Sequence, residues 1–465
     1  MYRKRDRKQV HIDDFILPFG GTLDAENRWI QLAKMMPWEY IEDMYAENMC
    51  PDNGAGAISA RIAFGALYIK ENEKLTDESA VEYISENPYM QYFLGLHEFT
   101  KKPLFDASMM VHFRKRFPAQ RVEEINKRMF VKREKEEKTD SGDDPPSTPP
   151  NSGKLVLDAT CAPADIRYPS DLSLLNEARE NTEEIIEELW GYSARRGHKT
   201  RYNRRKARAN YLRIAKQKRP KTAKQRASIG KQLQYIRLNM EDIGELLLET
   251  GLEVLSEKRQ RRLMVIGELL RQQSAMYKDK THQCENRIVS LRQPHVRPMV
   301  RGKAGRRYEF GQKLALSVVS GYTFIERQSF NNFNEGITLE ESVERFKATY
   351  GHYPEVVQAD QIYRNRKNLA YCKTHGIRLS GPKLGRPGKD IERDRQTEYR
   401  DRCERNIIEG RNGMAKRRFG LGLIIAYLLE TAMTEAALQV LCMNVRISVL
   451  FHTFFLWLFG EAALA

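Results

Sequence analysis

Three carboxylates have the residue type and setting that phosphoryl-transfer chemistry uses. Asp158 follows the apolar run Leu155-Val156-Leu157, Asp360 follows the apolar run at 356–359, and Glu409 lies in a charged helical pattern. We expect both aspartates to end short strands, so that their side chains converge on one edge of a sheet. A buried carboxylate is costly unless it is paired or binds a cation. Three such groups suit two Mg²⁺ ions about 3.5–4 Å apart, with Mn²⁺ as a substitute.

Taken singly, each acid is more often a strand cap, a helix cap or a surface residue. The combination gains weight from the charge of the chain, which carries 78 Lys and Arg against 62 Asp and Glu, a formal net charge of +16. A basic protein that binds a polyanion has a use for a site that cuts phosphodiesters.

The positive charge is concentrated in one block. Residues 195–226 contain 15 Lys or Arg and no Asp or Glu, and Arg204, Arg205 and Lys206 lie within it. Each phosphate that such a block neutralises releases counterions, which favours nucleic acid as the partner. The alternative is a solvated basic helix. A membrane surface fits less well because no broad apolar face accompanies the block.

The length and composition of the chain restrict the classes of protein to which it can belong. At 465 residues and 41% hydrophobic content, the chain has enough material for several domains with buried cores. The six cysteines are scattered without a CxxC pair, which indicates reduced thiols rather than a zinc site or a disulfide framework. The sequence contains no uninterrupted apolar run of about 18 residues, so we expect no membrane-spanning helix. We therefore expect a large, soluble, basic intracellular protein.

The first half of the chain divides at a linker. Residues 1–130 predict a helical domain, with helices over 57–68, 79–92, 109–116 and 121–130, that serves DNA binding or dimerisation. Residues 131–153 contain four prolines, mixed charge and small polar residues, which predicts a flexible linker.

The remainder predicts an α/β domain over 154–437, interrupted by a helical insertion at about 171–290. Strands are expected at 155–160, 355–359 and 377–380, with a hairpin around Ser320-Gly321. Helices are expected over 339–350, up to about 375, and, after the last strand, up to about 411. Within the insertion, two coiled-coil-like seams predict an antiparallel hairpin whose basic part faces phosphates, or a dimerisation surface. Residues 438–465 predict an apolar packing helix.

At this point the residues resemble a known family, the DDE transposases of bacterial insertion sequences. Three segments carry the resemblance: Leu155 to Thr160 is similar to the family's first catalytic strand, Gln358 to Asn368 to its D-x-x-Y…N segment, and Arg405-x3-Glu409-x6-Lys416 to its third signature. Arg402 stands where that signature has tyrosine. The resemblance implies an RNase H-like mixed-sheet core interrupted by the helical insertion and preceded by an all-α domain.

The resemblance also implies roles for residues. Asp158, Asp360 and Glu409 become the metal ligands of a two-metal site. Arg405 and Lys416 become contacts to phosphates beside the scissile bond, or salt-bridge partners of neighbouring acids. Tyr363 and Asn368 either position DNA or pack and cap the following helix, and Lys383 and Arg386, in a Gly/Pro-rich loop, either approach a DNA backbone or are solvated.

The function implied is that of a DNA transposase. Such an enzyme binds the terminal inverted repeats of its element, cleaves DNA with Mg²⁺ and joins the liberated 3′-hydroxyl to target DNA, as a homodimer in the synaptic complex and without a membrane. Two alternatives stay open: a nuclease that has the same metal site but does not join strands, and a non-catalytic DNA-binding relative.

Overall fold

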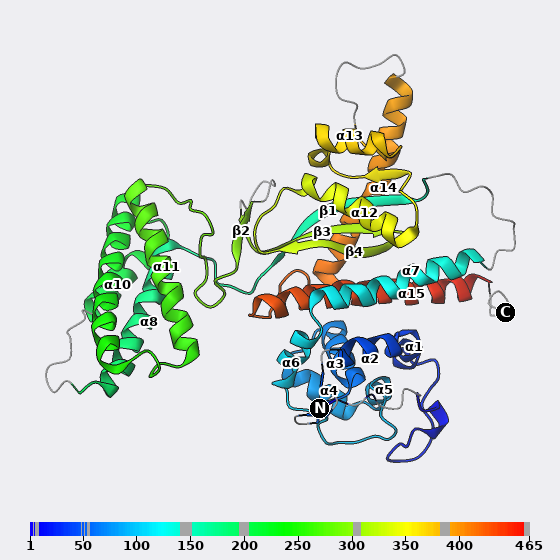
Figure 1. Cartoon of the computed structure of the whole chain (residues 1–465), viewed down its shortest axis with the longest axis horizontal. Coiled ribbons are helices and arrows are strands. Elements are labelled where there is room, and N and C mark those ends of the chain that lie inside the picture. Colours follow the sequence, from blue (N-terminus) through cyan, green and yellow to red (C-terminus); the bar gives the residue numbers. More distant parts are fainter. Residues whose placement is uncertain are drawn as a thin grey trace. The chain divides into compact units, whose positions relative to one another are not determined.

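The structure is a computed structural model that describes residues 1–2, 4, 9–47, 49–50, 52–53, 56–139, 151–194, 204–300, 308–381 and 391–459. The chain forms two compact units (Figure 1). Unit 1 comprises residues 1–163, 312–329 and 333–465, and unit 2 comprises residues 164–311 and 330–332. Each is a mixture of helices with strands of one mixed sheet, which agrees with the predicted α/β class.

Helices fill the first part of unit 1. Their bounds are η1 Ile12–Asp14, α1 Arg28–Met35, α2 Trp38–Ala46, α3 Ala60–Glu73, α4 Asp77–Glu86, α5 Pro88–Phe93, α6 Met109–Arg116 and α7 Ala119–Thr139. The helix expected over 79–92 is two helices, because the Asn87 side chain caps α5 and Pro88 occupies its first turn. A cluster of buried rings, including Trp29, Phe64 and Phe93, holds these helices together.

Helices α7 and α15 (Leu429–Phe459) pack along each other (Figure 1). Helix α7 continues to Thr139, so the linker predicted from residue 131 is wrong in its first nine residues; residues 140–150 lie outside the described chain. Helix α15 also begins before the predicted residue 438. In α15 the segment Leu429–Leu450 is long and apolar enough to span a membrane, but 78% of its most apolar window is buried inside the protein, as expected for a packing helix.

The sheet brings together segments that are distant in the chain. Its order is β2-β3-β1-β5-β6, with β4 paired to β3. The bounds are β1 Lys154–Pro163, β2 Arg297–Val300, β3 Tyr308–Val319, β4 Tyr322–Ser329, β5 Val356–Gln358 and β6 Arg378–Leu379. Strands β1, β5 and β6 pair in parallel, whereas β3 and β4 form an antiparallel hairpin. The predicted hairpin is confirmed, since Ser320 and Gly321 both have positive φ as two-residue hairpin turns require.

Four further helices of unit 1 flank these strands: α12 Leu339–Tyr350, α13 Arg366–Thr374, α14 Ile391–Arg418 and the α15 already given. Short 3₁₀ turns η2 (Glu335–Thr338) and η3 (Gln361–Tyr363) precede α12 and α13. Helices α12 and α14 both contact β1, and α7 and α15 both contact β4. The helix predicted over 339–350 is confirmed at both ends.

Unit 2 is built from α8 Asp171–Tyr192, α9 Arg204–Ala215, α10 Thr222–Thr250 and α11 Glu257–Asp279, together with β2. The expectation of a single helical hairpin is therefore wrong, because Pro220 and the positive-φ Gly251 separate additional helices. The two predicted seams do pack together, on α8 and α10, around buried Leu175, Ile236 and Leu233. The seams are thus used within the chain.

One buried acid in unit 1 makes stability depend on pH. Glu123 of α7 is 9% exposed, and its Oε1 has no hydrogen-bond partner among the described residues. Burial, with the nearby charge of Glu326, raises the pKa of Glu123 from 4.5 to about 8, against the opposing effects of Lys127 and Asn126. The native state thus keeps a proton that the unfolded chain releases, so the free energy of unfolding falls as pH rises from about 4.5 to 8.

We expect Glu123→Gln to raise the melting temperature at pH 8.5 by at least about 2–4 °C and to change it little at pH 5. Thermal unfolding of both proteins at the two pH values measures this. The same loss of stability with rising pH in the variant would contradict the assignment.

Candidate active site

Asp158 lies inside a strand rather than at its end. Strand β1 continues five residues beyond it to Pro163, so the prediction that the strand ends at Asp158 is wrong. The apolar run does end at Leu157, but β1 remains paired within the sheet between β3 and β5. The Asp158 side chain is half-buried, whereas a strand end would leave it more open.

Asp360 follows β5 as predicted. It caps η3, where its Oδ1 accepts a hydrogen bond of 2.8 Å from the backbone N–H of Gln361. In the parallel pairing of β1 with β5, Val156 lies opposite Gln358. Asp158 and Asp360 each lie two residues beyond this last pair, close enough for the charge of Asp360 to act on Asp158.

Helix α14 supplies a stripe of polar side chains to these aspartates. Arg405, Glu409, Asn412 and Lys416 recur at spacings of four, three and four, which places them on one helical face. Arg405 pairs with Asp360 at 3.3 Å and with Glu409 at 3.6 Å, and Asn412 donates a 2.9 Å hydrogen bond to Asp158 Oδ2. The structure therefore brings the three predicted acids into one neighbourhood, linked through Arg405 and Asn412.

The electrostatics of Asp158 reflect this crowding. Burial raises its pKa from 3.8 to about 6, and the negative charges of Glu335 and Asp360 add to the rise, against the Ala159 N–H and Arg405. Glu335 itself forms a 2.9 Å ion pair with Lys313, and both side chains are mostly buried. Burial and the two neighbouring acids thus outweigh the effect of Arg405 on the pKa of Asp158.

Sequence reasoning missed Asn412, Glu335 and Lys313. Asn412 could have been found from its helical spacing to Arg405 and Glu409, because it lies on the same stripe. Glu335 and Lys313 carried no such signal, since an acid at the start of a helix and a lysine in a strand are common.

The side chains around Asp158 carry oxygen atoms, the ligand type that hard divalent cations prefer. Four acids, Asp158, Glu335, Asp360 and Glu409, act on the same region, and the buried Asn412 Oδ1 accepts no hydrogen bond within the described chain. As arranged, no group of three His, Cys, Asp or Glu side chains among the described residues is close enough to hold a metal ion. Arg405 holds Asp360 and Glu409, so a cation would compete with its guanidinium for them.

The residues expected to position DNA beside the second aspartate are buried instead. Tyr363 is fully buried, and Asn368 is 4% exposed. The Asn368 amide donates to the carbonyl oxygens of Gly336 and Tyr363, which joins η2 to η3. This placement fits the packing alternative, although the cap of α13 is Asn365 rather than Asn368.

The other predicted DNA contacts lie elsewhere. Arg204 on α9 pairs with Glu183 and Glu187, each at 3.1 Å, while Arg205 and Lys206 beside it are exposed. These three belong to unit 2. Lys383 and Arg386 lie outside the described residues.

Comparison with known proteins finds two transposase families. A family described as "Transposase DDE domain" matches residues 357–446, a segment that contains Asp360, Arg405, Glu409 and Asn412. A second family, described as "Transposase domain (DUF772)", matches residues 19–116, the helical part of unit 1. Asp158 lies outside both matches.

One similar protein is the uncharacterized protein ORF8 in the nfe locus of Rhizobium meliloti, which is 30% identical over 164 residues, 34% of this chain and 75% of the relative. No solved structure matches the chain. The two family matches indicate a transposase. Residues 357–446 are thus similar to a transposase DDE domain and residues 19–116 to a second transposase domain, which is consistent with a DDE transposase of an insertion sequence.

Proposed function

We propose that this transposase binds the terminal inverted repeats of its element and catalyses metal-dependent cleavage and joining of DNA strands. The observation that carries the proposal is the meeting of Asp158 and Asp360 with the Glu409 face of α14. A mixed sheet with one acid within β1, a second just after β5 and a third on a helix packed against β1 supports an RNase H-like catalytic core.

Asp158, Asp360 and Glu409 would hold the metal ions. A pair of Mg²⁺ ions supplies an activated attacking oxygen and stabilises the leaving oxygen of a phosphodiester. Asn412 fixes the orientation of Asp158 through its hydrogen bond, and Lys416 extends the same face of α14. Arg405 lies between Asp360 and Glu409, and its guanidinium would be available to pair with a phosphate if the two carboxylates bound a cation instead.

The rest of the chain would bind and arrange DNA. We assign the helical residues 1–130 to DNA binding or dimerisation, the strands and helices of 154–437 to catalysis, and the inserted helices of unit 2 to contacts with DNA backbones. Exposed Arg205 and Lys206 on α9, in a segment without acids, support the last assignment. Two copies of the chain would hold the two element ends in a homodimeric complex.

The test uses the purified full-length protein, Mg²⁺ and duplex DNA that carries the element's ends. We expect 3′-hydroxyl ends to be released and joined to a target duplex, and we expect removal of divalent metal to stop both steps while binding to the ends persists. Cleavage without joining would establish the nuclease alternative, and binding without cleavage the non-catalytic one. Either outcome would refute the proposal.

A further inference from the structure

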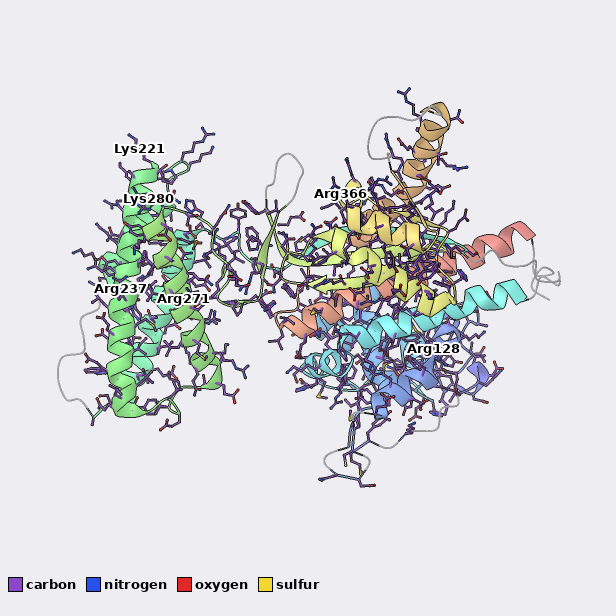
Figure 2. The ribbon with its side chains drawn as sticks, turned by 45° about the horizontal axis from the view of Figure 1, so that its top comes forward. Arg128, Lys221, Arg237, Arg271, Lys280 and Arg366 are labelled. Atoms are coloured by element: carbon purple, nitrogen blue, oxygen red, sulfur yellow. The ribbon has the colours of Figure 1, made fainter. Side chains whose placement is uncertain are left out.

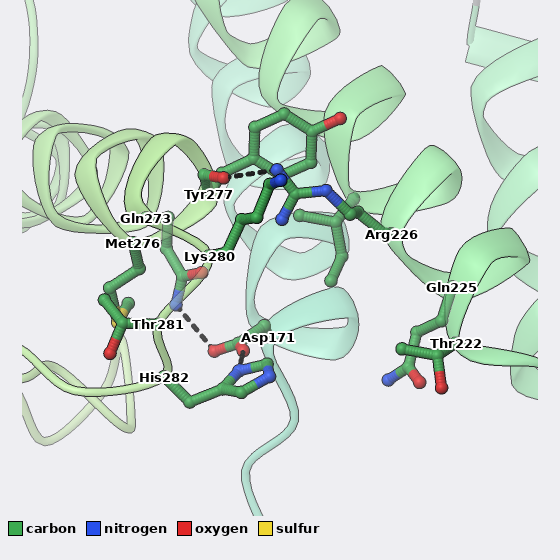
Figure 3. Close-up of a pocket in the computed structure, with 11 residues that line it drawn as sticks. Asp171, Thr222, Gln225, Arg226, Gln273, Met276, Tyr277, Lys280, Thr281 and His282 are labelled. Carbon is green, nitrogen blue, oxygen red and sulfur yellow. Dashed lines mark hydrogen bonds and ion pairs between the residues drawn. The ribbon is translucent and has the colours of Figure 1, made fainter.

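Unit 2 contains a cavity of about 480 Å³ that the proposed chemistry does not use (Figure 3). It lies where α8 and α10 begin and α11 ends, and its lining includes Asp171, Thr222, Arg226, Tyr277 and Lys280. Its volume falls within the range of small-molecule binding sites, roughly 300–1,000 Å³. A single nucleotide is a ligand of this size class.

A flat cationic surface forms one wall. The Arg226 guanidinium lies over the Tyr277 ring, 4.2 Å from its centroid, and donates a 2.6 Å hydrogen bond to the Tyr277 carbonyl oxygen (Figure 3). The hydrogen bond and the ring together fix the guanidinium. Ile229 and Met276 add apolar surface nearby. Planar guanidinium and aromatic groups beside apolar side chains are suited to stacking with a nucleobase.

The Tyr277 ring depends on a glycine in the middle of α10. A Cβ on Gly230 would lie 2.7 Å from the Tyr277 hydroxyl oxygen, so a larger residue would have to shift the ring. Glycine inside a helix is unfavourable by about 1 kcal/mol relative to alanine. The sequence therefore keeps room for this ring at a cost to the helix.

The acid in the cavity wall does not oppose an anionic ligand. Asp171 accepts hydrogen bonds from Arg287 at 2.7 Å and from Gln273 at 2.9 Å, and His282 lies 3.1 Å from its other oxygen. Burial opposes ionisation of Asp171, but the charge of Arg287 and these hydrogen bonds outweigh it and lower its pKa. The charge of Asp171 is thus compensated by the protein itself.

The surface around the cavity is strongly basic. Lys221 and Lys280 lie at the same end of unit 2, away from Arg237 and Arg271 along the helices (Figure 2). Exposed basic side chains continue on the chain before and after Lys221: Lys216, Lys218, Arg219 and Lys224. On the α11 side, Asp279 is the acid next to Lys280. So many cations favour a polymer with several phosphates over a free mononucleotide.

We propose that this cavity binds one unpaired nucleotide of a DNA strand, with its base against Arg226 and Tyr277 and its phosphates among the surrounding lysines. The inference rests on the proposed function, since it takes DNA as the substrate. It adds a site that distinguishes single-stranded from double-stranded DNA. A base stacked inside a duplex cannot enter a cavity, so the site selects single-stranded ends or gaps.

The test measures binding of the full-length protein, without divalent metal, to a fluorescent 15-nucleotide single strand and to the blunt duplex of the same sequence. Arg226→Ala removes the planar guanidinium, and Arg226→Lys keeps the positive charge without the planar group. Gly230→Ala displaces the Tyr277 ring while favouring helix α10. The control is Arg237→Ala, an exposed arginine on the same helix, about 16 Å further along it.

We expect Arg226→Ala and Gly230→Ala to weaken single-strand binding by about tenfold and duplex binding by no more than about twofold. The control Arg237→Ala should weaken binding of either DNA by no more than about twofold. Arg226→Lys should weaken single-strand binding without changing its salt dependence, because the charge remains. Equal losses for both DNAs, unchanged single-strand binding, or saturation of the cavity by free mononucleotide alone would each overturn this inference. None of those results bears on cleavage by the acids of unit 1, which is measured separately.

Discussion

Replacing Asp360 by alanine is expected to abolish both DNA cleavage and strand joining while leaving DNA binding intact. Asp360 follows the strand that pairs with β1, which carries Asp158, and it shares Arg405 with Glu409, so its removal takes one carboxylate from the proposed metal site. We expect the rate of both reactions to fall on the order of 10³-fold or more. Cleavage and joining of the element's ends, followed on a sequencing gel, measure the loss.

Two further variants separate chemistry from folding. Asp360→Asn keeps an oxygen that can cap η3 toward the Gln361 N–H, but it removes the charge, and we expect it to be as inactive as the alanine variant. Glu355→Gln changes an exposed acid at the opposite end of β5 and should leave activity unchanged. Joining that persists in Asp360→Ala would show that Asp360 is not a ligand.

Replacing Arg405 by alanine should slow cleavage by about 10² while raising the affinity for Mn²⁺. The guanidinium pairs with Asp360 and Glu409 at 3.3 and 3.6 Å, and these acids are 58% and 61% exposed, so the pairs are weak and open to exchange. Without Arg405 a cation meets no competitor for the two carboxylates, but a phosphate loses its partner. Mn²⁺ titration and cleavage kinetics give the two readouts.

The matched control is Arg400→Ala, an exposed arginine on α14 that points about 140° away from Arg405 around the helix. It should change neither quantity. If Arg405 only holds the acids in place, Arg405→Ala will instead lower Mn²⁺ affinity together with activity. That result would contradict a role in phosphate contact.

The sequence predicted those elements whose signals lie within a few neighbouring residues. Helix α12 and the turn at Ser320-Gly321 follow from apolar periodicity and from turn chemistry within a few residues. The two seams of unit 2 were correct for the same reason. The number of helices there was not, because Pro220 and Gly251 act as breaks that the seam spacing does not reveal.

The sequence predicted the three acids of the candidate site but not the residues around them. Asp158 and Asp360 could be placed at strands from their apolar runs, whereas Glu335 reaches the site only because η2 packs against η3, the turn that Asp360 caps. Whether a residue such as Tyr363 faces DNA or the core depends on which side of η3 is covered. That is a property of packing between distant segments, which no short pattern contains.

The most direct test of the account is the position of the metal. Crystals of the protein grown with its DNA ends and Mn²⁺ would reveal the ions by their anomalous scattering. We predict peaks in direct contact with carboxylate oxygens of Asp158 and Asp360, with Glu409 as a further ligand and the Arg405 guanidinium turned to a phosphate. Mn²⁺ bound elsewhere, or at Asp360 without Asp158, would contradict the account.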